Sequence, residues 1–460
     1  MSSTPWRHRD HTRGSLATSL FVLALPLLAS GVLGSTVFQI AELSFLARLG
    51  EAPLAAVTIT NQTVRQVYFL IAMGLSFATQ SLIARAVGAG DLEQAEHVAG
   101  QSIALGLLLS AAVAAVGWAF PDALFGLPGP DPSFAEHGVP YLRLVFLLNF
   151  GVVGTMLFAA ILGGAGDTTT PLLVQLVQSG VAILAEWLLI FGNLGAPALG
   201  VRGVALGAAA GQAVAMGLGV WLLFRGKSRV RLRRDHVIPD WRTIGALAGM
   251  SWLPAAQMIG GLATTFAFVR LCGSYGENVQ AAYAISLRVG MIVPMVCFPL
   301  AGACSTLVGQ ALGAGEVRRA WHAVRIGLLA HGAIMGLLAA VVIGLRHELM
   351  ALLSDDPEVM QHGAVFLLYS GLSFFFFAFY FVVMRSLQGA GDFAVPMAVT
   401  LGGAFFVTIP LSFWLARGLA LGPTGIAVGQ LVGAAFVTLA TSAWFLTGRW
   451  TRRGAHSPPR

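Results

Sequence analysis

Two acidic residues, Glu42 and Glu186, lie within long apolar runs of this sequence. A charged side chain at the centre of a bilayer costs at least about 2.5–3.5 kcal/mol on insertion scales, so such an acid usually has a role. In a shared pocket, desolvation and mutual repulsion would favour the protonated carboxyl, which could bind and release a proton. The same oxygens could bind Na⁺ instead. A static hydrogen-bonded carboxyl between helices, or a glutamate that reaches outward to the membrane surface, would also explain either residue.

Polar side chains accompany each acid at spacings that place them on one helix face. These are Ser35 and Gln39 before Glu42, and Gln175 and Gln178 before Glu186. At 1.5 Å per residue, Glu42 is about 12 Å from Gly50 and Glu186 is about 9 Å from Gly192, so the two acids are predicted at similar depth. Both polar stripes are predicted to face the interior of a helix bundle.

A basic residue, Arg65, is predicted at comparable depth in the next apolar run. Asn61 and Tyr68 lie four residues before it and three residues after it, on the same helix face. Arg65 could neutralise Glu42 or bind an anionic group, and an ordinary buried ion pair is the simpler interpretation. A pair with Glu42 would favour the ionised carboxylate and would weaken a proton site. Tyr141, in a later apolar run, could anchor its helix at the membrane interface.

The composition places these residues in a membrane protein. Of the 460 residues, 57% are hydrophobic and only 10% are charged, whereas soluble chains carry roughly 25% charged residues. Continuous apolar runs in lipid must be helices, since every backbone group has to be bonded internally. The net charge of +7 would suit nucleic acid, but the basic residues flank the apolar runs. We therefore expect membrane lipid, and no nucleic acid, as a partner.

Apolar runs separated by glycine, proline or charge clusters predict an all-α polytopic protein with twelve transmembrane helices. The predicted spans are 15–47, 53–84, 94–119, 134–163, 170–192, 197–225, 241–271, 279–310, 318–345, 359–388, 395–417 and 423–447. The predicted domains are a cytoplasmic tail (1–14), a six-helix lobe (15–225), a basic cytoplasmic linker (226–240), a second six-helix lobe (241–447) and a cytoplasmic tail (448–460). The three most basic segments are the two ends and the linker, so both termini are predicted to be cytoplasmic.

An internal repeat relates the two predicted lobes. The G-A-G-D motif at 88–91 matches G-A-G-E at 313–316, and G-A-G-D at 164–167 matches the same motif at 389–392. Both matches need a shift of about 225 residues. Six crossings per half is an even number, so two homologous six-helix bundles are predicted to be related by a pseudo-twofold axis along the membrane normal.

Motifs for enzymatic chemistry are missing from the sequence. It contains no H-E-x-x-H, G-x-S-x-G, C-x-x-C or P-loop pattern. The chain is therefore predicted not to be an enzyme and to need no organic cofactor or resident metal, apart from Na⁺ if it binds at Glu42 and Glu186. Without a nucleotide site, transport would draw on a gradient of H⁺ or Na⁺.

Four short passages have an order, spacing and duplication typical of one transporter family. They read R-L-G-E-A-P-L-A-A at 48–56, G-A-G-D at 88–91, G-A-G-D-T at 164–168 followed by Pro171, and L-V-G-Q-A-L-G-A-G at 307–315. Through them the chain resembles the multidrug and toxic compound extrusion (MATE) transporters over essentially its whole length. The resemblance implies two six-helix bundles around a V-shaped cleft in a bacterial-type inner membrane. It also implies export of cationic or amphiphilic compounds in exchange for H⁺ or Na⁺.

The DinF-like branch of this family is the most similar. That branch has aspartates at the positions of Glu42 and Glu186, an asparagine at the position of Ala182, and a polar network that aligns with Tyr141. The two glutamates and the alanine depart from this pattern and leave the identity of the coupling ion open. Other branches carry acids in the second lobe, whereas 254–269 and 367–387 have none here. The resemblance thus implies that coupling lies in the first lobe.

The predicted mechanism is alternating access, in which ion and substrate favour different conformations. Pro26 and Gly34 are the predicted hinge positions in the first helix, because both residues weaken helix continuity. Nothing in the sequence requires more than a monomer. An alternative is a flippase for lipid-linked saccharides, which Arg65, Arg143 and Arg288 would suit. A membrane-embedded enzyme or scaffold is a remote second alternative.

Overall fold

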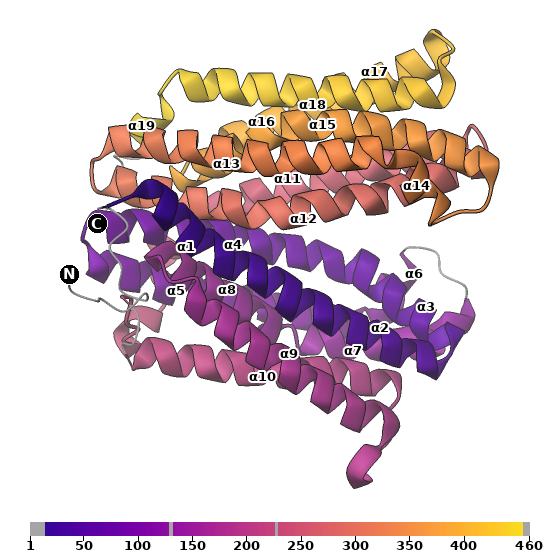
Figure 1. The fold of residues 1–460 in the computed structure, drawn as a ribbon. Coiled ribbons are helices and arrows are strands. Elements are labelled where there is room, and N and C mark those ends of the chain that lie inside the picture. The colour runs from indigo at the N-terminus through magenta and orange to yellow at the C-terminus, as the bar shows by residue number, and fades with distance from the viewer. Residues whose placement is uncertain (1–13, 128–131, 226–228, 454–460) are drawn as a thin grey trace. The chain divides into compact units, whose positions relative to one another are not determined.

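The computed structural model describes residues 14–127, 132–225 and 229–453. The chain is 88% helical, and its described residues form no β-strand. Grouped across their short interruptions, the helices of the described residues form twelve long segments. Their order can be followed in Figure 1. This confirms the predicted all-α class, and the segments begin and end within a few residues of the predicted spans.

The first six segments are α1 (Leu16–Ala29) with α2 (Val37–Leu49), α3 (Glu51–Ile59) with α4 (Arg65–Gly88), α5 (Leu92–Ala119), α7 (Ala135–Leu147) with α8 (Phe150–Ala165), α9 (Thr169–Phe191) and α10 (Val201–Phe224). The second six are α11 (Trp241–Gly273), α12 (Glu277–Gly313), α13 (Val317–Gly344), α15 (Pro357–Gly389), α16 (Ala394–Gly402) with α17 (Ile409–Phe413), and α18 (Gly422–Leu446). Short helices α6 (Pro121–Gly126), α14 (Arg346–Ala351) and α19 (Trp450–Arg453) connect or end them. Among described residues, nine helices are long and apolar enough to cross a membrane, or ten if the bent α7–α8 pair counts as one span.

Several segments are interrupted by π-helical turns. One turn (Ser30–Thr36) joins α1 to α2, another (Thr60–Val64) joins α3 to α4, and two more (Gly403–Thr408 and Trp414–Gly418) flank α17. A π-helical turn holds an extra residue and is frequent at functional sites. The first two turns lie in the helices that carry Glu42 and Arg65.

The fourth segment bends by 45° between α7 and α8. A bend frees backbone carbonyls that need other donors. The amide of Asn149, at the bend, donates to the carbonyls of Phe146 and Ser110. The buried Asn149 side chain therefore bonds one carbonyl at the bend, that of Phe146, and ties the bend to α5 through Ser110.

The repeated G-A-G motifs form the predicted turns in both halves. Gly90 and Gly315 have φ of +76° and +75°, and Gly166 and Gly391 have φ of +90° and +86°. Only glycine adopts this left-handed conformation readily. At the first of these turns the acid that follows caps the next helix, since the Asp91 carboxylate accepts from the Gln94 N–H at 3.0 Å. Matching glycines thus have matching backbone geometry, as the internal repeat predicts.

Packing divides the chain into two compact units. The first contains Leu25–Ala255, and the second contains Ala256–Arg460 together with 11–24. The first part of α1 belongs to the second unit because Leu20 and Leu23 lie in one buried cluster with Leu300. The predicted lobes, 15–225 and 241–447, divide the chain at the linker instead, and their bounds stay a prediction. The tails and the linker lie partly outside the described residues.

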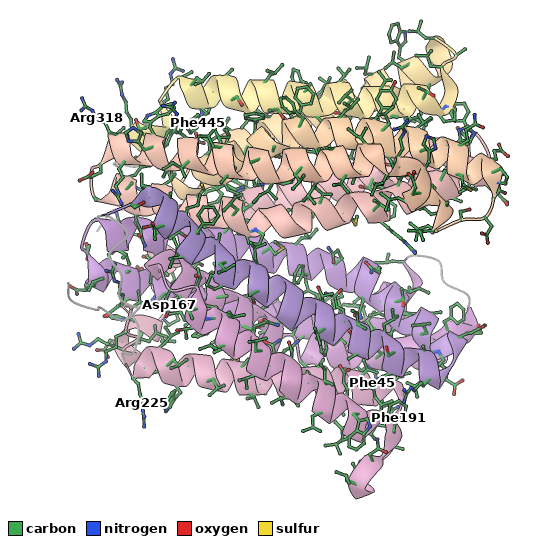
Figure 2. All side chains as sticks on the ribbon, viewed as in Figure 1. Phe45, Asp167, Phe191, Arg225, Arg318 and Phe445 are labelled. Carbon is green, nitrogen blue, oxygen red and sulfur yellow. The ribbon has the colours of Figure 1, made fainter. Side chains whose placement is uncertain are left out.

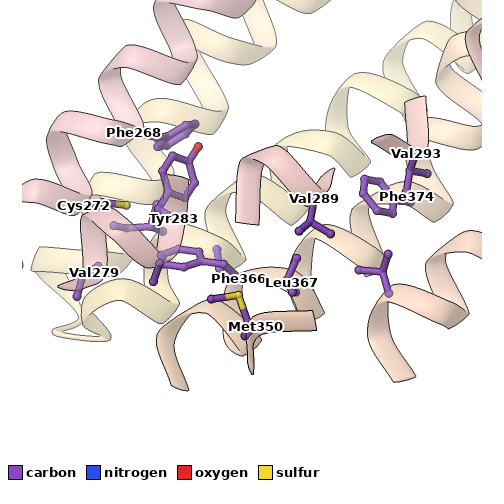
Figure 3. Packing of buried hydrophobic residues seen from close by; sticks show 14 of the residues in the cluster. Phe268, Cys272, Val279, Tyr283, Val289, Val293, Met350, Phe366, Leu367 and Phe374 are labelled. Atoms are coloured by element: carbon purple, nitrogen blue, oxygen red, sulfur yellow. The ribbon is translucent and has the colours of Figure 1, made fainter. Parts of the chain in front are cut away.

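Each unit has its own core. In the second unit, Phe268, Tyr283 and Phe374 pack in one large cluster (Figure 3). In the first unit, the rings of Phe45 and Phe191 meet edge to face at 5.8 Å. These two rings lie at one end of the unit, and Asp167 and Arg225 lie at the other (Figure 2).

Candidate functional site

A small cavity in the first unit brings together residues from α2, α4, α7 and α10. Its polar lining consists of Glu42, Arg65, Tyr141 and Gln212, and its volume is about 40 Å³. One water molecule needs at least about 10–15 Å³, and drug-sized ligands occupy pockets of about 300–1,000 Å³. The cavity therefore has room for a few water molecules or a small ion, but not for an organic substrate.

Asn61 links two of the residues at this cavity. Its side-chain oxygen accepts from the Arg65 guanidinium at 3.1 Å and from the Tyr141 hydroxyl at 3.2 Å. Asn61 lies in the π-helical turn that joins α3 to α4, one helical turn before Arg65. Tyr68 is buried on the same helix, with its ring edge to face against Phe146 at 5.2 Å. The predicted group of Asn61, Arg65, Tyr68 and Tyr141 therefore gathers around one place.

Glu42 does not form the ion pair that the sequence left open. Within the described ranges, no nitrogen of Arg65 lies within 4.0 Å of a Glu42 oxygen. The guanidinium donates to Asn61 instead, while the Glu42 carboxyl lines the cavity. Arg65 thus adds positive charge near Glu42 without holding its carboxylate directly.

Glu186 is completely buried in α9. Neither of its carboxyl oxygens has a hydrogen-bond partner among the residues that the structure describes. An ionised carboxylate left in this setting would carry an uncompensated desolvation penalty of several kcal/mol. A bound proton or a bound cation would remove that penalty.

Close packing of α10 against α9 seals Glu186. A Cβ atom at Gly207 would lie 2.5 Å from the Glu186 Cγ and 2.6 Å from the Glu186 backbone nitrogen. One turn earlier, Gly203 lies against the Leu189 carbonyl, and one turn later, Gly211 lies against the Gln178 carbonyl. Glycines at every fourth position let two helix backbones approach closely, a pattern familiar from membrane helices.

Glu186 is close to the cavity although it does not line it. Ala205, Ala208 and Ala209 of α10 line the cavity and flank Gly207, which contacts Glu186. Small residues of α10 therefore line the cavity at Glu42 and also contact Glu186.

The polar residues that accompany the two acids do not all lie where the sequence predicts. Gln175 and Gln178 are both half-buried. Gln175 packs against Gly34, where an added Cβ would lie 2.6 Å from the Gln175 Cγ. Gln39 is exposed, so the prediction that it faces the bundle interior is wrong. The side chain of Ser35 lies outside the described residues.

The predicted hinge residues have different surroundings. Pro26 lies inside α1, directly after the point where the two compact units divide the chain. Gly34 lies inside the π-helical turn, and its carbonyl accepts from the Ser179 hydroxyl at 2.8 Å. Ser179 was not predicted. Its spacing of four residues from Gln175 and seven residues from Glu186 would have indicated a shared face.

Gln212 was also missed at the cavity. It lies one turn beyond Ala208 in a helix dominated by glycine and alanine, where a polar residue is itself a signal. In the described part of the chain, no group of three or more His, Cys, Asp or Glu residues could hold a metal ion.

Comparison with known proteins places these features in context. The MatE family model matches residues 27–188 and 255–414. The two matches begin 228 residues apart (255 minus 27), close to the shift of the internal repeat. The probable multidrug resistance protein NorM of Thermotoga maritima is 25% identical over 440 residues, 94% of this chain and 93% of that protein. The multidrug resistance protein PmpM of Pseudomonas aeruginosa is 27% identical over 434 residues, 90% of this chain and 88% of that protein.

Solved structures have the same fold. A MATE crystal structure in the bent conformation superposes with a TM-score of 0.87 at 21% identity, covering 97% of this chain and 98% of that one. An outward-facing multidrug resistance MATE family transporter of the MOP superfamily gives a TM-score of 0.85 at 22% identity, covering 99% of both chains.

Proposed function

Because this chain belongs to the MatE family, we propose that it exports small organic molecules in exchange for H⁺ or Na⁺ bound near Glu42 and Glu186. The chain is a multi-pass membrane transporter and not an enzyme. The names of its relatives support drug-like substrates, and we take cationic or amphiphilic compounds as their class. The assignment to the DinF-like branch stays a prediction, as do the monomeric state, the inner membrane and the cytoplasmic termini.

The burial of Glu186 is the observation that supports this proposal most directly. Its carboxyl has no hydrogen-bond donor among described residues, and the nearby cavity has room only for water or an ion. A proton or Na⁺ that arrives there neutralises the carboxylate and stabilises the packed α9–α10 arrangement. Loss of the ion leaves a buried charge and favours a conformation that lets water reach it.

The residues around Glu42 suit the entry step of this exchange. Glu42 lines the cavity directly, and Asn61, Tyr141 and Gln212 supply neutral polar groups beside it. An ion would reach Glu42 first and Glu186 behind the wall formed by α10. Pro26 and the π-helical turn of the first helix are where α1 and α2 would change direction in the exchange.

The flippase alternative gains no specific support. Of the three arginines that suggested it, only Arg65 lines the cavity. Arg143 is exposed and lies over the ring of Trp118 at 5.3 Å. Arg288 is exposed in the second unit. Arg65 and Arg143, both in the first unit, therefore do not line this cavity together.

Proteoliposomes loaded with ethidium test the proposal. We expect efflux driven by an imposed proton or sodium gradient, and the effective gradient identifies the ion. Glu186→Gln removes the titratable group at similar size and should abolish gradient-driven efflux, and Glu42→Gln should weaken it strongly. Glu93→Gln, at an exposed position in the first turn of α5, is the matched control. Undiminished efflux in both Glu186→Gln and Glu42→Gln would rule out coupling through these carboxyls.

A further inference from the structure

The second unit contains a larger cavity whose described lining carries no charge. Its volume is about 370 Å³, within the range of about 300–1,000 Å³ for pockets that hold drug-sized ligands. It lies among α11, α12, α15, α18 and the broken helix that includes α16. Among its described lining residues there is no Asp, Glu, Lys, Arg or His. The cavity is thus nine times the size of the one at Glu42, and electrically neutral.

Aromatic rings form much of the wall. They belong to Phe268, Tyr283, Phe374, Phe377, Tyr380 and Phe381. Tyr283 lies beside Phe268 in Figure 3. Offset and edge-to-face contacts with such rings favour a flat aromatic ligand, at about 0.5–1.5 kcal/mol per pair beyond area burial.

The polar groups of the wall are mainly hydrogen-bond acceptors. Six of its hydroxyls donate their proton to a carbonyl of their own helix segment, and these belong to Thr264, Thr265, Ser286, Ser373, Thr400 and Thr408. Their oxygens keep free lone pairs. The Gln430 amide donates to the Tyr283 hydroxyl at 2.8 Å, so the Gln430 oxygen is a further acceptor and the Tyr283 O–H is a donor of the wall. A ligand that carries N–H or O–H donors fits this wall.

A hydrogen-bond chain from a buried cation argues against a positively charged ligand. Arg385, which is 2% exposed, donates to the Gln388 side-chain oxygen at 2.8 Å. Gln388 donates to the Gln257 oxygen at 3.5 Å, and the Gln257 amide donates to the Tyr380 hydroxyl at 2.7 Å. Each amide accepts on the side of the arginine and donates on the side of the cavity. The chain therefore directs the positive ends of its dipoles at the wall.

We propose that this cavity binds electrically neutral, flat aromatic molecules that carry hydrogen-bond donors. Without a carboxylate in the described wall, a bound organic cation would be desolvated and would meet only aromatic faces, each worth about 0.5–2 kcal/mol. A neutral molecule avoids that penalty. Since the inference adds neutral aromatic molecules to the cationic or amphiphilic compounds proposed for export, its physiological meaning rests on the proposed function, whereas binding can be measured by itself.

Isothermal titration of the full-length protein in nanodiscs can compare two tricyclic probes of similar shape. Acridone is neutral and has an N–H donor, and 9-aminoacridine is a cation at pH 7. We expect acridone to bind at least about tenfold more tightly, a difference of about 1.4 kcal/mol. Equal or tighter binding of 9-aminoacridine to the native protein would overturn the proposal.

Two glycine variants locate the binding. Gly290 lines the cavity, and a Cβ there would meet only the Phe374 ring, at 3.9 Å. Gly290→Leu should therefore fill the cavity and weaken acridone binding at least about tenfold, and Gly290→Ala should show a smaller loss if the leucine variant folds poorly. Gly336→Leu, at an exposed position of α13 where a Cβ meets nothing within 4 Å, is the control. Acridone binding that is equal in Gly290→Leu, Gly290→Ala and Gly336→Leu would place the probe elsewhere and refute this site.

A charge exchange provides an independent test. Gln430→Glu keeps the shape of the side chain and adds a carboxylate, so 9-aminoacridine should gain affinity relative to acridone. All these titrations are done without an ion gradient. Failure of gradient-driven ethidium efflux would therefore not change their outcome, and failure of acridone binding would leave the coupling proposal intact.

Discussion

Replacing Gly207 with alanine should destabilise the protein by forcing α10 away from α9. The new Cβ would lie 2.5–2.8 Å from the Cγ, N and Cα atoms of Glu186. Two of these atoms are backbone, so no side-chain rotation relieves the contact. Overpacking of this kind costs about 1–3 kcal/mol. Alanine also stabilises a helix interior by about 0.5–1 kcal/mol relative to glycine, which offsets part of the overpacking cost.

Gly217→Ala isolates the overpacking. Gly217 is on the same helix, exposed, and a Cβ there meets nothing within 4 Å. Both variants gain the same helix propensity, so the free energies of unfolding should differ by the overpacking alone, about 1–3 kcal/mol. Thermal unfolding in detergent, followed by tryptophan fluorescence at one scan rate, should give a melting temperature lower by a few degrees for Gly207→Ala. Equal melting temperatures would show that α10 does not seal Glu186.

Three further predictions concern the first unit. Asn61→Ala removes the acceptor of the Arg65 guanidinium and the Tyr141 hydroxyl. It should lower the free energy of unfolding by about 1–3 kcal/mol, measured by the same thermal unfolding. Gln101 is fully buried and donates at 2.8 Å to the Ile238 carbonyl of the linker, so Gln101→Ala should speed tryptic cleavage within 229–234 several-fold relative to the native chain. Hydrogen bonds from the Thr243 hydroxyl and the backbone lower the pKa of the Asp240 carboxyl below its usual 3.8. The fold therefore favours the ionised Asp240 carboxylate. Its contribution to stability is present above pH 4 and is lost as the pH falls through the lowered pKa. Protection of the linker from an acid-tolerant protease should decline over that pH range in the native chain but not in Asp240→Asn.

The sequence was sufficient for the fold because lipid leaves few alternatives. Continuous apolar runs have to be helices, and glycine and charge clusters have to lie between them, so all twelve segments could be predicted with their order. The left-handed glycines of the four G-A-G turns were also predictable, since no other residue adopts that conformation readily. The π-helical turns were not predictable, because tertiary contacts such as the Ser179 bond to the Gly34 carbonyl help to stabilise them.

The candidate site was predictable only in part. An acidic residue in an apolar run is costly to place in a membrane, so the sequence alone identified Glu42 and Glu186 as candidates without knowledge of their neighbours. Which polar side chains join them depends on how each helix is rotated about its axis, and the spacing of Gln39 from Glu42 did not reveal that Gln39 is exposed. The sealing of Glu186 by Gly207 was not predicted either, because small residues on one helix do not reveal which helix they contact.

The π-helical turns also give the first two helices a way to rotate without unfolding. Such a turn stores one surplus residue, and if the surplus moved along the helix by one turn, the side chains it passed would swing by about 100° around the axis. In the first helix, movement of the turn at Ser30–Thr36 toward the C-terminus would carry the exposed Gln39 around the helix axis. A cysteine at position 39 would report this through a change in its thiol-labelling rate when the gradient is reversed. A rotary register change of this kind would alter what surrounds Glu42 while every helix stays at its original length.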